Sequence, residues 1–431
     1  MKSITIKRTN SLRGEITVPG DKSISHRAIM FGAIAEGDTS IKGLLKGEDN
    51  MATLNAFRQM GVRIDEHGNG IVAIQGKGLR SLKEPEDVID AGNSGTTIRL
   101  LTGLLSGQEF FSVLTGDQYL RKRPMKRVVE PLSLMGAKIF GREDGNKAPL
   151  AIVGSKLKGI TYNSPVASAQ VKSAILLAGL YADGNTTVAE PTLSRDHTER
   201  MLAYFGAKVK RSGTAVSIAG GQKLTGREII IPGDISSAAF FIVAALITED
   251  SELLIKNVGI NPARTGIIDI LKAMGGRLDI LDKRDVSGEP VGDILVKSSK
   301  LKGVEIQGDM IPRAIDELPI AAVAAAFAEG TTTIKDAKEL KVKETDRIES
   351  MTSELRRIGV KVTPLPDGMT IEGRKKPIGN DSCNSWGDHR VAMSMIVAGL
   401  ASEKGITISN TDCIDTSFPG FMKLLESIKR A

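Results

Sequence analysis

The stretch VPGDKSIS at 18–25 recurs as IPGDISSA at 231–238, close to the middle of this chain of 431 residues. In both copies a strand-like run passes through a Pro-Gly-Asp turn into Ser and Ala residues that favour the start of a helix. The two copies open two halves of similar length. Since 431 residues exceed what a single hydrophobic core usually supports, we expect two domains that share one architecture.

A helix-end pattern also recurs along the chain. It has the form apolar-x-x-apolar-Gly-x-basic-apolar, as in FRQMGVRI ending at Ile64. Its glycine supplies the left-handed residue that commonly ends a helix, and the alternating residues after it predict a strand. The five glycines are Gly61, Gly136, Gly206, Gly275 and Gly359. We expect a sixth helix over 421–430, with Lys429 where the glycine would fall.

A second unit lies between these helices: a strand, a short turn, another strand, and a Gly-containing loop that leads into an Ala- and Ser-rich helix. Its six copies span 4–25, 71–97, 150–170, 216–238, 294–316 and 369–392. The N-terminal strands have no preceding helix and the C-terminal helix has no following strand, so the two ends are expected to complete one split unit. The sequence predicts an α/β fold of six repeats, three per domain, with a solenoid array as the alternative.

The domain boundaries follow from the split unit. If it closes with the C-terminal half, one domain holds 1–19 with 233–431 and the other holds 20–232. The chain then crosses between domains twice, near Gly20 and near Gly233. Two short crossings of this kind can act as a hinge because they absorb the rotation of both domains.

Composition places the chain among folded, soluble proteins, with 41% hydrophobic and 25% charged residues. The N-terminus lacks an apolar signal region, and the apolar runs at 238–247 and 320–328 are too short to span a bilayer, so they predict buried helices. The two cysteines, Cys383 and Cys413, form neither a disulfide framework nor a zinc motif. We expect a cytoplasmic protein with no membrane segment and no metal.

The charge balance favours an anionic partner. Lys and Arg outnumber Asp and Glu by 58 to 51. Nucleic-acid binders commonly combine basic tracts with stacking aromatic residues, whereas this chain has one Trp, four Tyr and no run of five basic residues. A small anionic substrate is therefore favoured over nucleic acid, although ordinary solvated charge remains an alternative at this point.

Candidate anion-binding residues recur where a loop enters a helix. A helix start offers free N–H groups and the positive end of the helix dipole. The candidates in the first half of the chain are Lys22, Ser23 and Arg27 in PGDKSISHR, Gly95 in AGNSGTTIRL, Arg123 in RKRP, Ser168 and Gln170 in SPVASAQVKSA, and Arg195 in LSRDHTER. Taken singly, each motif also has a structural interpretation as a cap, a turn, a solvated cation or an internal salt bridge.

The second half adds carboxylates to these cations. In KVKETDRIES, Lys343 and Arg347 are expected to share a helix face, with Glu344 beside them. Arg390 follows Asp388 at a loop-to-helix start. Asp316 is expected to head the buried Ala-rich helix, where a desolvated carboxylate would be available for proton transfer, or alternatively would act only as an N-cap.

In their order and spacing, PGDKSISHR, GNSGTTIR, RKRPM, KETDR and DHRVAM resemble the motifs of the 5-enolpyruvylshikimate-3-phosphate synthase family over essentially the whole chain. The resemblance implies a two-domain inside-out α/β barrel of six βαβαββ units, with the active site between the domains. It further implies transfer of the enolpyruvyl group of phosphoenolpyruvate to the 5-hydroxyl of shikimate 3-phosphate, without a cofactor. A monomer that binds these small molecules, and neither nucleic acid nor membrane, is expected.

The resemblance also implies roles for individual residues. Shikimate 3-phosphate would be held by Lys22, Ser23, Arg27, Ser168, Arg195, Asp316 and Lys343. Phosphoenolpyruvate would be held by Lys22, Gly95, Arg123, Gln170, Arg347 and Arg390. Asp316 is the candidate base for the 5-hydroxyl and Glu344 the candidate acid for C3, while Lys22 is a candidate to share these proton transfers.

Two departures and two alternatives accompany the resemblance. Thr416 precedes SFP, where one branch of the family carries a Lys near the substrate. Gly95 is the residue that some glyphosate-insensitive members replace by Ala, so inhibition by glyphosate is a hypothesis.

The related transferase acting on UDP-N-acetylglucosamine carries a reactive Cys in a mobile loop, but no Cys lies between 1 and 382 here. A non-enzymatic phosphate- or RNA-binding repeat protein would make no use of Asp316 and Glu344.

Overall fold

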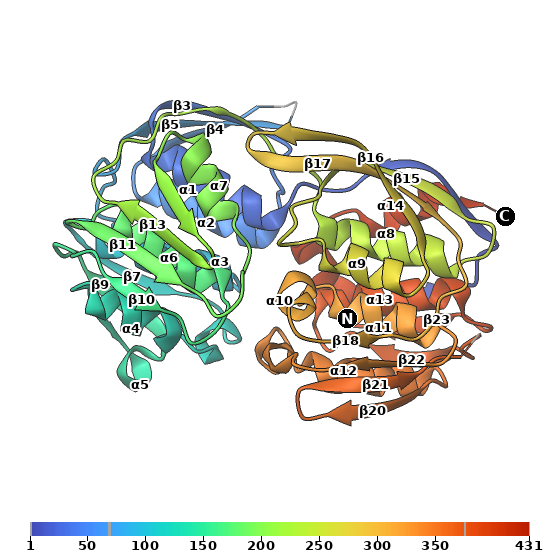
Figure 1. The fold of residues 1–431 in the computed structure, drawn as a ribbon. Helices are drawn as coiled ribbons and strands as arrows, with labels where there is room; N and C mark the ends of the chain where they lie inside the picture. The colour runs from blue at the N-terminus through green and yellow to red at the C-terminus, as the bar shows by residue number, and fades with distance from the viewer. Residues whose placement is uncertain (1, 68–69, 375, 431) are drawn as a thin grey trace. The chain divides into compact units, whose positions relative to one another are not determined.

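The computed structural model describes residues 2–67, 70–374 and 376–430. The chain divides into two compact units: unit 1 holds Met1–Pro19, Pro232–Asp285 and Pro290–Ala431, and unit 2 holds Gly20–Ile231 and Val286–Glu289 (Figure 1). The turn Val286–Glu289 had been expected with the C-terminal half. It groups with unit 2 because Glu289 pairs with His197 at 2.8 Å and the Ser287 hydroxyl accepts the backbone N–H of Ile230 at 3.0 Å.

In the described part of the chain, six sheets follow one pattern, in which a strand pairs parallel with its neighbour and that neighbour pairs antiparallel with the next. The first sheet of unit 2 has the strand order β14 (Glu228–Ile230), β3 (Glu36–Lys42), β5 (Ile71–Lys77), β4 (Arg63–Glu66). The second has the order β6 (Ile89–Asp90), β7 (Phe111–Thr115), β9 (Lys147–Val153), β8 (Lys138–Gly141). The third has the order β10 (Thr161–Asn163), β11 (Asn185–Ala189), β13 (Ala215–Ala219), β12 (Val209–Ser212).

The three sheets of unit 1 repeat this pattern and include both ends of the chain. The first has the strand order β16 (Arg277–Val286), β17 (Glu289–Lys297), β15 (Glu252–Gly259), β2 (Ser11–Thr17), β24 (Lys429–Arg430). The second has the order β18 (Glu305–Ile306), β19 (Thr331–Ile334), β21 (Gly368–Glu372), β20 (Lys361–Leu365). The third has the order β1 (Ile4–Ile6), β23 (Ile406–Ser409), β22 (Asn380–Asn384).

The repeated strand–turn–strand segments are not hairpins. Each turn carries the chain from one sheet into the next, as between β9 and β10 or between β17 and β18. In unit 2, β14 returns to pair with β3 in the first sheet, so the three sheets close into a ring. The six-repeat prediction is confirmed, including the split unit, because β2 pairs with β24.

An inner and an outer helix accompany each repeat. The inner helices are α1 (Lys22–Ile34), α3 (Gly95–Ser106) and α6 (Ala169–Gly179) in unit 2, and α8 (Ile235–Ile247), α11 (Leu318–Ala326) and α13 (His389–Ala401) in unit 1. The outer helices are α2 (Glu48–Gln59), α4 (Lys126–Leu134), α7 (His197–Tyr204), α9 (Gly266–Ala273), α12 (Arg347–Arg357) and α14 (Phe421–Ile428). Short elements are α5 (Arg142–Gly145), α10 (Met310–Ala314) and the 3₁₀ turns η1 (Leu120–Lys122), η2 (Lys338–Val342) and η3 (Thr411–Thr416).

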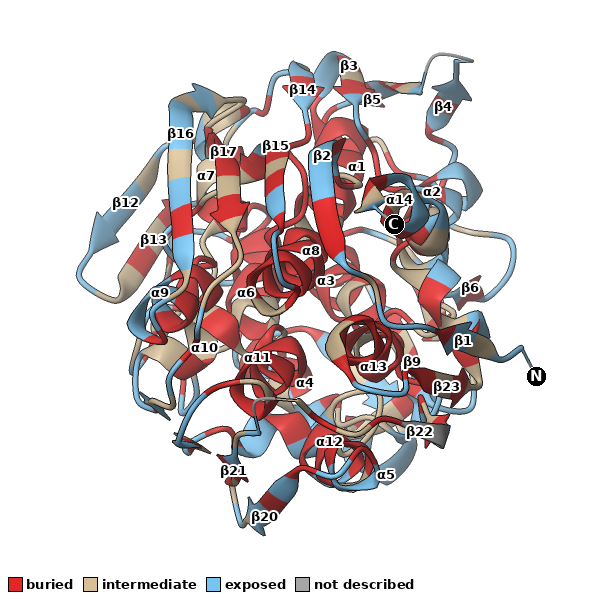
Figure 2. Cartoon of the chain, turned by 90° about the vertical axis from the view of Figure 1, so that its right-hand side faces the viewer, coloured by how far each residue is buried: buried red, intermediate tan, exposed pale blue. Residues whose placement is uncertain are grey.

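The inner helices form the centre of each unit, because most of their residues are apolar and nearly all are buried. Every residue of α11 is buried, and so is α8 up to Leu246. Figure 2 shows α8, α11 and α13 nearly end-on, coloured as buried, with exposed strand faces at the periphery of unit 1. In unit 2 the helices α3 and α6 pack closely at Gly103, where a Cβ would lie 2.1 Å from the carbonyl oxygen of Ala174. Helices inside and sheets outside confirm the inside-out barrel.

The helix ends follow the sequence pattern with one difference. The five repeated glycines all have positive φ, between 79° at Gly61 and 99° at Gly206, as a left-handed helix end requires. The sixth helix had been expected to run to residue 430. It ends at Ile428, because Lys429 and Arg430 are extended and pair with β2.

Candidate active site

Several candidate residues lie at the N-terminal ends of the inner helices, namely Lys22, Ser23, Gly95, Ser168, Gln170 and Arg390. Arg123, Arg195, Lys343, Glu344 and Arg347 lie instead before or at the start of outer helices. A side chain caps five of the six inner helices by accepting a backbone N–H: Asp21, Ser94, Ser168, Asp234 and Asp388. At the sixth, α11, Glu317 holds the capping position without such a bond. The remaining N–H groups and the helix dipoles make these ends favourable for anions, as the sequence indicated.

Lys22 and Ser23 are the first two residues of α1. The ammonium group of Lys22 pairs with the carboxylate of Asp49 at the start of α2, and its carbonyl accepts a hydrogen bond from the Asn50 amide at 3.0 Å. The side chain of Lys22 keeps 24% of its surface exposed. Lys22 is therefore positioned by α2 and still accessible to a ligand.

Arg27 lies one turn further along α1 and is buried. Its guanidinium donates hydrogen bonds to the hydroxyls of Thr198 at 2.7 Å and Ser173 at 2.8 Å, and to the carbonyl of Ser23 at 2.9 Å. These bonds use three of the five N–H groups of a guanidinium. Burial lowers the pKa of Arg27 to about 10, although Glu199 opposes the shift. Arg27 is thus a fixed cation at neutral pH.

A chain of buried side chains connects α1 to the start of α3. Nδ1 of His26 lies 2.7 Å from the Thr53 hydroxyl, which lies 2.7 Å from the Thr97 hydroxyl, and Thr97 donates to Ser94 at 2.7 Å. Burial lowers the pKa of His26 to about 3, so its ring is neutral in the folded protein. Since Ser94 caps α3, this neutral chain supports the helix start that carries Gly95.

We expect stability to fall in acid because of His26. Between pH 6.5 and pH 3 the unfolded chain binds a proton that the folded ring does not, so the free energy of unfolding decreases as pH falls through this range. From pH 6.5 to 5 the loss from this group is about 2 kcal/mol. Urea unfolding at both pH values should show that much less loss in His26→Gln than in wild type. The exposed-histidine control His67→Gln should keep the wild-type loss, and equal losses in all three proteins would contradict the assignment.

Gly95 leaves room for two guanidinium groups at the start of α3. A Cβ at this position would lie 2.9 Å from Nη1 of Arg99 and 3.3 Å from Nη1 of Arg123. Arg99 donates to Oε1 of Gln170 at 2.6 Å, and Arg123 donates to Oδ1 of Asn93 at 2.5 Å. The structure therefore brings Gly95, Arg123 and Gln170 together around Arg99.

Ser168 caps α6, and Arg195 lies in the segment before α7. The sequence left open whether Arg195 forms an internal salt bridge with Asp196. The carboxylate of Asp196 pairs with Arg200 at 2.9 Å and with Arg211 at 3.0 Å. A ligand role for Arg195 stays a prediction.

Asp316 does not head a helix, contrary to the sequence prediction. It lies between α10 and α11, and α11 begins at Leu318 with Glu317 at its capping position. The carboxylate of Asp316 accepts a hydrogen bond from Lys343 at 3.2 Å and lies 3.5 Å from Nη1 of Arg347. Its side chain keeps 15% of its surface exposed. Asp316 is therefore held between two cations rather than used as a cap.

The expectation that Lys343 and Arg347 share a helix face is also wrong. Helix α12 begins at Arg347, because Asp346 caps it by accepting the backbone N–H groups of Ile348 and Glu349. Lys343 lies in the segment before the helix. Lys343 and Arg347 nevertheless meet at Asp316, through the fold of this segment rather than through helical spacing.

Arg347 is the centre of a buried charge cluster. Its guanidinium pairs with Asp388 at 2.8 Å, with Glu344 at 2.6 Å and with Asp316 at 3.5 Å, and its side chain is 1% exposed. Burial acts against its charge, but the three carboxylates raise the pKa of Arg347 above its usual value. Burial also acts against the charge of Asp388 and by itself would raise the pKa of this carboxyl group, but the neighbouring Arg347 holds that pKa below its usual range. This cluster fixes two candidate proton-transfer groups, Asp316 and Glu344, around one permanent cation.

Arg390 joins the same cluster from α13. Its Nη1 donates to the backbone carbonyl of Asp316 at 3.0 Å and lies 4.0 Å from Oε1 of Glu317. Thr416, the departure from one branch of the family, ends η3, and its hydroxyl donates to the carbonyl of Cys413 at 2.6 Å.

Sequence reasoning missed three charged partners of the candidate residues. Asp49 pairs with Lys22, Arg99 bonds Gln170, and Asp388 pairs with Arg347. All three lie near the start of a helix: Asp49 is the second residue of α2, Arg99 is the fifth residue of α3, and Asp388 caps α13. Their position in the repeat was therefore a usable signal, but the partner of each could not be found without the fold.

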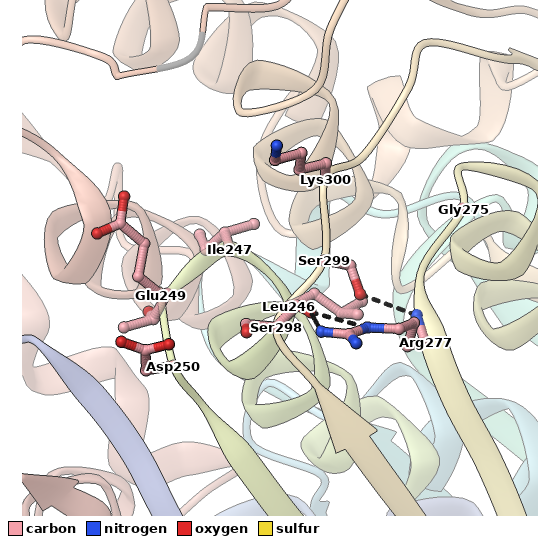
Figure 3. Close-up of a pocket in the computed structure, with 10 residues that line it drawn as sticks. Leu246, Ile247, Glu249, Asp250, Gly275, Arg277, Ser298, Ser299 and Lys300 are labelled. Atoms are coloured by element: carbon pink, nitrogen blue, oxygen red, sulfur yellow. Dashed lines mark hydrogen bonds between the residues drawn. The ribbon is translucent and has the colours of Figure 1, made fainter.

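An open pocket in unit 1 lies apart from these residues, at the C-terminal end of α8 (Figure 3). Arg277 lines it, but its guanidinium is bonded to the carbonyl of Ser298 at 3.1 Å. The other lining residues are Leu246, Ile247, Thr248, Glu249, Asp250, Gly275, Ser299 and Lys300. None of the predicted site residues lines this pocket.

Within residues 2–67, 70–374 and 376–430, no helix has the length and apolar character needed to cross a membrane. The same described part of the chain contains no group of three or more His, Cys, Asp or Glu side chains arranged to hold a metal ion.

Comparison with known proteins identifies the family. Residues 6–425 match the sequence model of EPSP synthase (3-phosphoshikimate 1-carboxyvinyltransferase). A 3-phosphoshikimate 1-carboxyvinyltransferase of Geobacter metallireducens is 64% identical over 428 residues, covering 99% of both chains, and one of Geobacter sulfurreducens is 62% identical with the same coverage. A solved EPSP synthase structure from Acinetobacter baumannii superposes with a TM-score of 0.89 at 50% identity, over 99% of this chain and 98% of that chain.

These matches extend over almost the whole chain and bear the same family name. They do not favour the UDP-N-acetylglucosamine transferase or a non-enzymatic repeat protein. The chain therefore belongs to the EPSP synthase family, and it is an enzyme that transfers an enolpyruvyl group in the shikimate pathway.

Proposed function

We propose that this chain joins the 5-hydroxyl of shikimate 3-phosphate to C2 of phosphoenolpyruvate and then eliminates phosphate, using the residues predicted from the sequence. The observation that carries the proposal is the cluster around Arg347, which gathers Asp316, Glu344 and Lys343 beside the start of α13. It supplies carboxylates for proton transfer and cations for two acidic substrates at one place.

The proposed reaction has two steps. In the addition, Asp316 accepts the proton of the 5-hydroxyl, the oxygen bonds to C2, and Glu344 protonates C3. In the elimination, Glu344 takes a proton back from C3 as the bond between C2 and the phosphate oxygen breaks, and the departing phosphate takes up the proton that Asp316 holds. Lys22 is a third candidate for these transfers. The cations stabilise the substrate carboxylate and the departing phosphate, which needs no covalent intermediate with the protein.

The two substrates divide the cations between them. For shikimate 3-phosphate we propose Lys22, Ser23, Arg27, Ser168, Arg195, Asp316 and Lys343. For phosphoenolpyruvate we propose Lys22, Gly95, Arg123, Gln170, Arg347 and Arg390. Support within unit 2 comes from two separate groupings: Arg123 and Gln170 gather around Arg99, whereas Arg27 bonds the hydroxyls of Ser173 on α6 and Thr198 on α7.

The division of substrates predicts opposite kinetic effects for two arginines. Arg195→Ala should raise KM for shikimate 3-phosphate by about 10- to 100-fold, because a charged hydrogen bond to an anion is worth about 1.5–3 kcal/mol. Arg123→Ala should raise KM for phosphoenolpyruvate to a similar extent. Each variant should leave the other KM within about twofold of wild type. Steady-state kinetics with one substrate varied at a time measures both constants.

The matched control is Arg63→Ala, which removes a cation that is 72% exposed on β4. Both KM values should then stay as in wild type. If Arg195→Ala changed only KM for phosphoenolpyruvate, the proposed division would be wrong.

Inhibition by glyphosate in competition with phosphoenolpyruvate stays a prediction that rests on the glycine at Gly95.

We also propose a monomer that acts in the cytoplasm on these small molecules, without nucleic acid, membrane or cofactor. Free thiols at Cys383 and Cys413 suit a reducing compartment. The two chain crossings near Gly20 and Gly233 would serve as the hinge between domains 1–19 with 233–431 and 20–232.

A further inference from the structure

A buried ion cluster in unit 2 has no part in the proposed chemistry. Nζ of Lys172 lies 2.8 Å from Oε2 of Glu190 and 2.9 Å from Oε1 of Glu199. The three side chains are 3%, 1% and 4% exposed. Burial acts against the charge of Lys172, but the two carboxylates raise its pKa above the usual value. Burying three ionised groups costs folding free energy unless their contacts are well satisfied, so this cluster calls for an explanation.

The cluster is bonded to the backbone on both sides of the predicted phosphate-binding residues. Oε1 of Glu190 accepts the backbone N–H of Ser168 at 2.9 Å and the Ser194 hydroxyl at 2.7 Å. Oε2 of Glu190 accepts the backbone N–H of Ser194 at 3.3 Å, and Lys172 donates to the Ser194 carbonyl at 3.5 Å. Ser194 directly precedes Arg195. One carboxylate thus fixes the cap of α6 and the segment that carries Arg195.

The same cluster adjoins the contacts that hold Arg27. Ser173, which follows Lys172, accepts from Nη2 of Arg27 at 2.8 Å, and Thr198, which precedes Glu199, accepts from Nε of Arg27 at 2.7 Å. The hydroxyls of Ser173 and Thr198 lie 2.7 Å apart. A shift of Lys172 relative to Glu199 would therefore move both supports of the guanidinium.

We infer that the Glu190–Lys172–Glu199 cluster positions Ser168, Arg27 and Arg195 in a preorganised site for the phosphate of shikimate 3-phosphate. This inference rests on the proposed roles of those three residues. Lys172, Glu190 and Glu199 are positioning residues: they act through their neighbours. Preorganisation of this kind lowers the ordering cost of binding, so its loss weakens affinity for one substrate.

The test is the dissociation constant of shikimate 3-phosphate, measured by titration calorimetry on the whole protein. Lys172→Met should raise it by about tenfold or more, and the isosteric Glu190→Gln by about threefold or more, because each loosens the Ser168 and Ser194 contacts. KM for phosphoenolpyruvate should stay within about twofold of wild type. Leu150→Ala, a truncation in the buried core at β9, controls for stability: it should lower Tm and leave both constants unchanged.

A double variant separates positioning from a structural role. Because Lys172 acts partly through Arg195 and partly through Arg27 and Ser168, Lys172→Met should weaken binding less in Arg195→Ala than it does in wild type. Independent, multiplying effects would overturn the inference, and so would wild-type affinity in either cluster variant. Should Lys172→Met fail to fold, Glu190→Gln decides alone. If Arg195→Ala itself binds shikimate 3-phosphate as wild type does, the proposed site residues fail instead.

Discussion

Asp316→Asn is expected to lower kcat by about 10²- to 10⁴-fold, the usual contribution of a general base. The amide keeps the shape of the carboxylate but cannot accept the proton of the 5-hydroxyl. Because Lys343 and Arg347 lose an anionic partner, we also expect a smaller rise in KM for shikimate 3-phosphate. Phosphate release at saturating concentrations of both substrates measures kcat directly.

The control for this prediction is Asp309→Asn, which changes an exposed carboxylate at the start of α10. Its kcat should match wild type. A fall in kcat of less than about fivefold in Asp316→Asn, together with a large rise in KM for shikimate 3-phosphate, would assign Asp316 to binding and remove it as the base.

Arg347→Met is expected to lower the free energy of unfolding by about 3–5 kcal/mol and to abolish measurable activity. The guanidinium is 1% exposed and is paired with three carboxylates, so its removal leaves the fully buried Asp388 and the 27% exposed Glu344 without their cation. Urea unfolding gives the change in stability. The double variant Arg347→Met with Asp388→Asn should recover part of that stability, without activity, because it removes one of the uncompensated charges.

The matched control is Arg356→Met on the solvent side of the same helix. It should change stability by less than about 1.5 kcal/mol, because Arg356 is exposed and gives up one hydrogen bond, from its Nε to the carbonyl of Val362 at 2.8 Å. If Arg347→Met were as stable as this control, the three carboxylates would not depend on Arg347, and the electrostatic account of the cluster would be wrong.

The sequence was sufficient for the repeat architecture because its signals are local. A glycine such as Gly61 or Gly359 is required by the backbone conformation of the helix end itself, so the same residue recurs in successive repeats. The inner helices α8 and α11 were also readable, since the apolar runs at 238–247 and 320–328 predict buried helices. The position of the candidate residues at the loop-to-helix corners follows from these two facts.

The pairing of charged residues was not readable in the same way. Lys172 is 18 positions from Glu190 and 27 from Glu199, and Arg347 is 41 from Asp388. No helical or strand spacing connects such pairs. The start of α12 was misjudged because KVKETDRIES contains no Gly or Pro to mark a boundary, whereas the capping bonds of Asp346 show that the helix begins at Arg347.

The most direct test of the account is phosphate release from phosphoenolpyruvate by the wild-type protein, measured with and without shikimate 3-phosphate. The account predicts release only when shikimate 3-phosphate is present, with one enolpyruvyl ether formed for each phosphate. Release at the same rate without shikimate 3-phosphate, or no release with both substrates present, would contradict it.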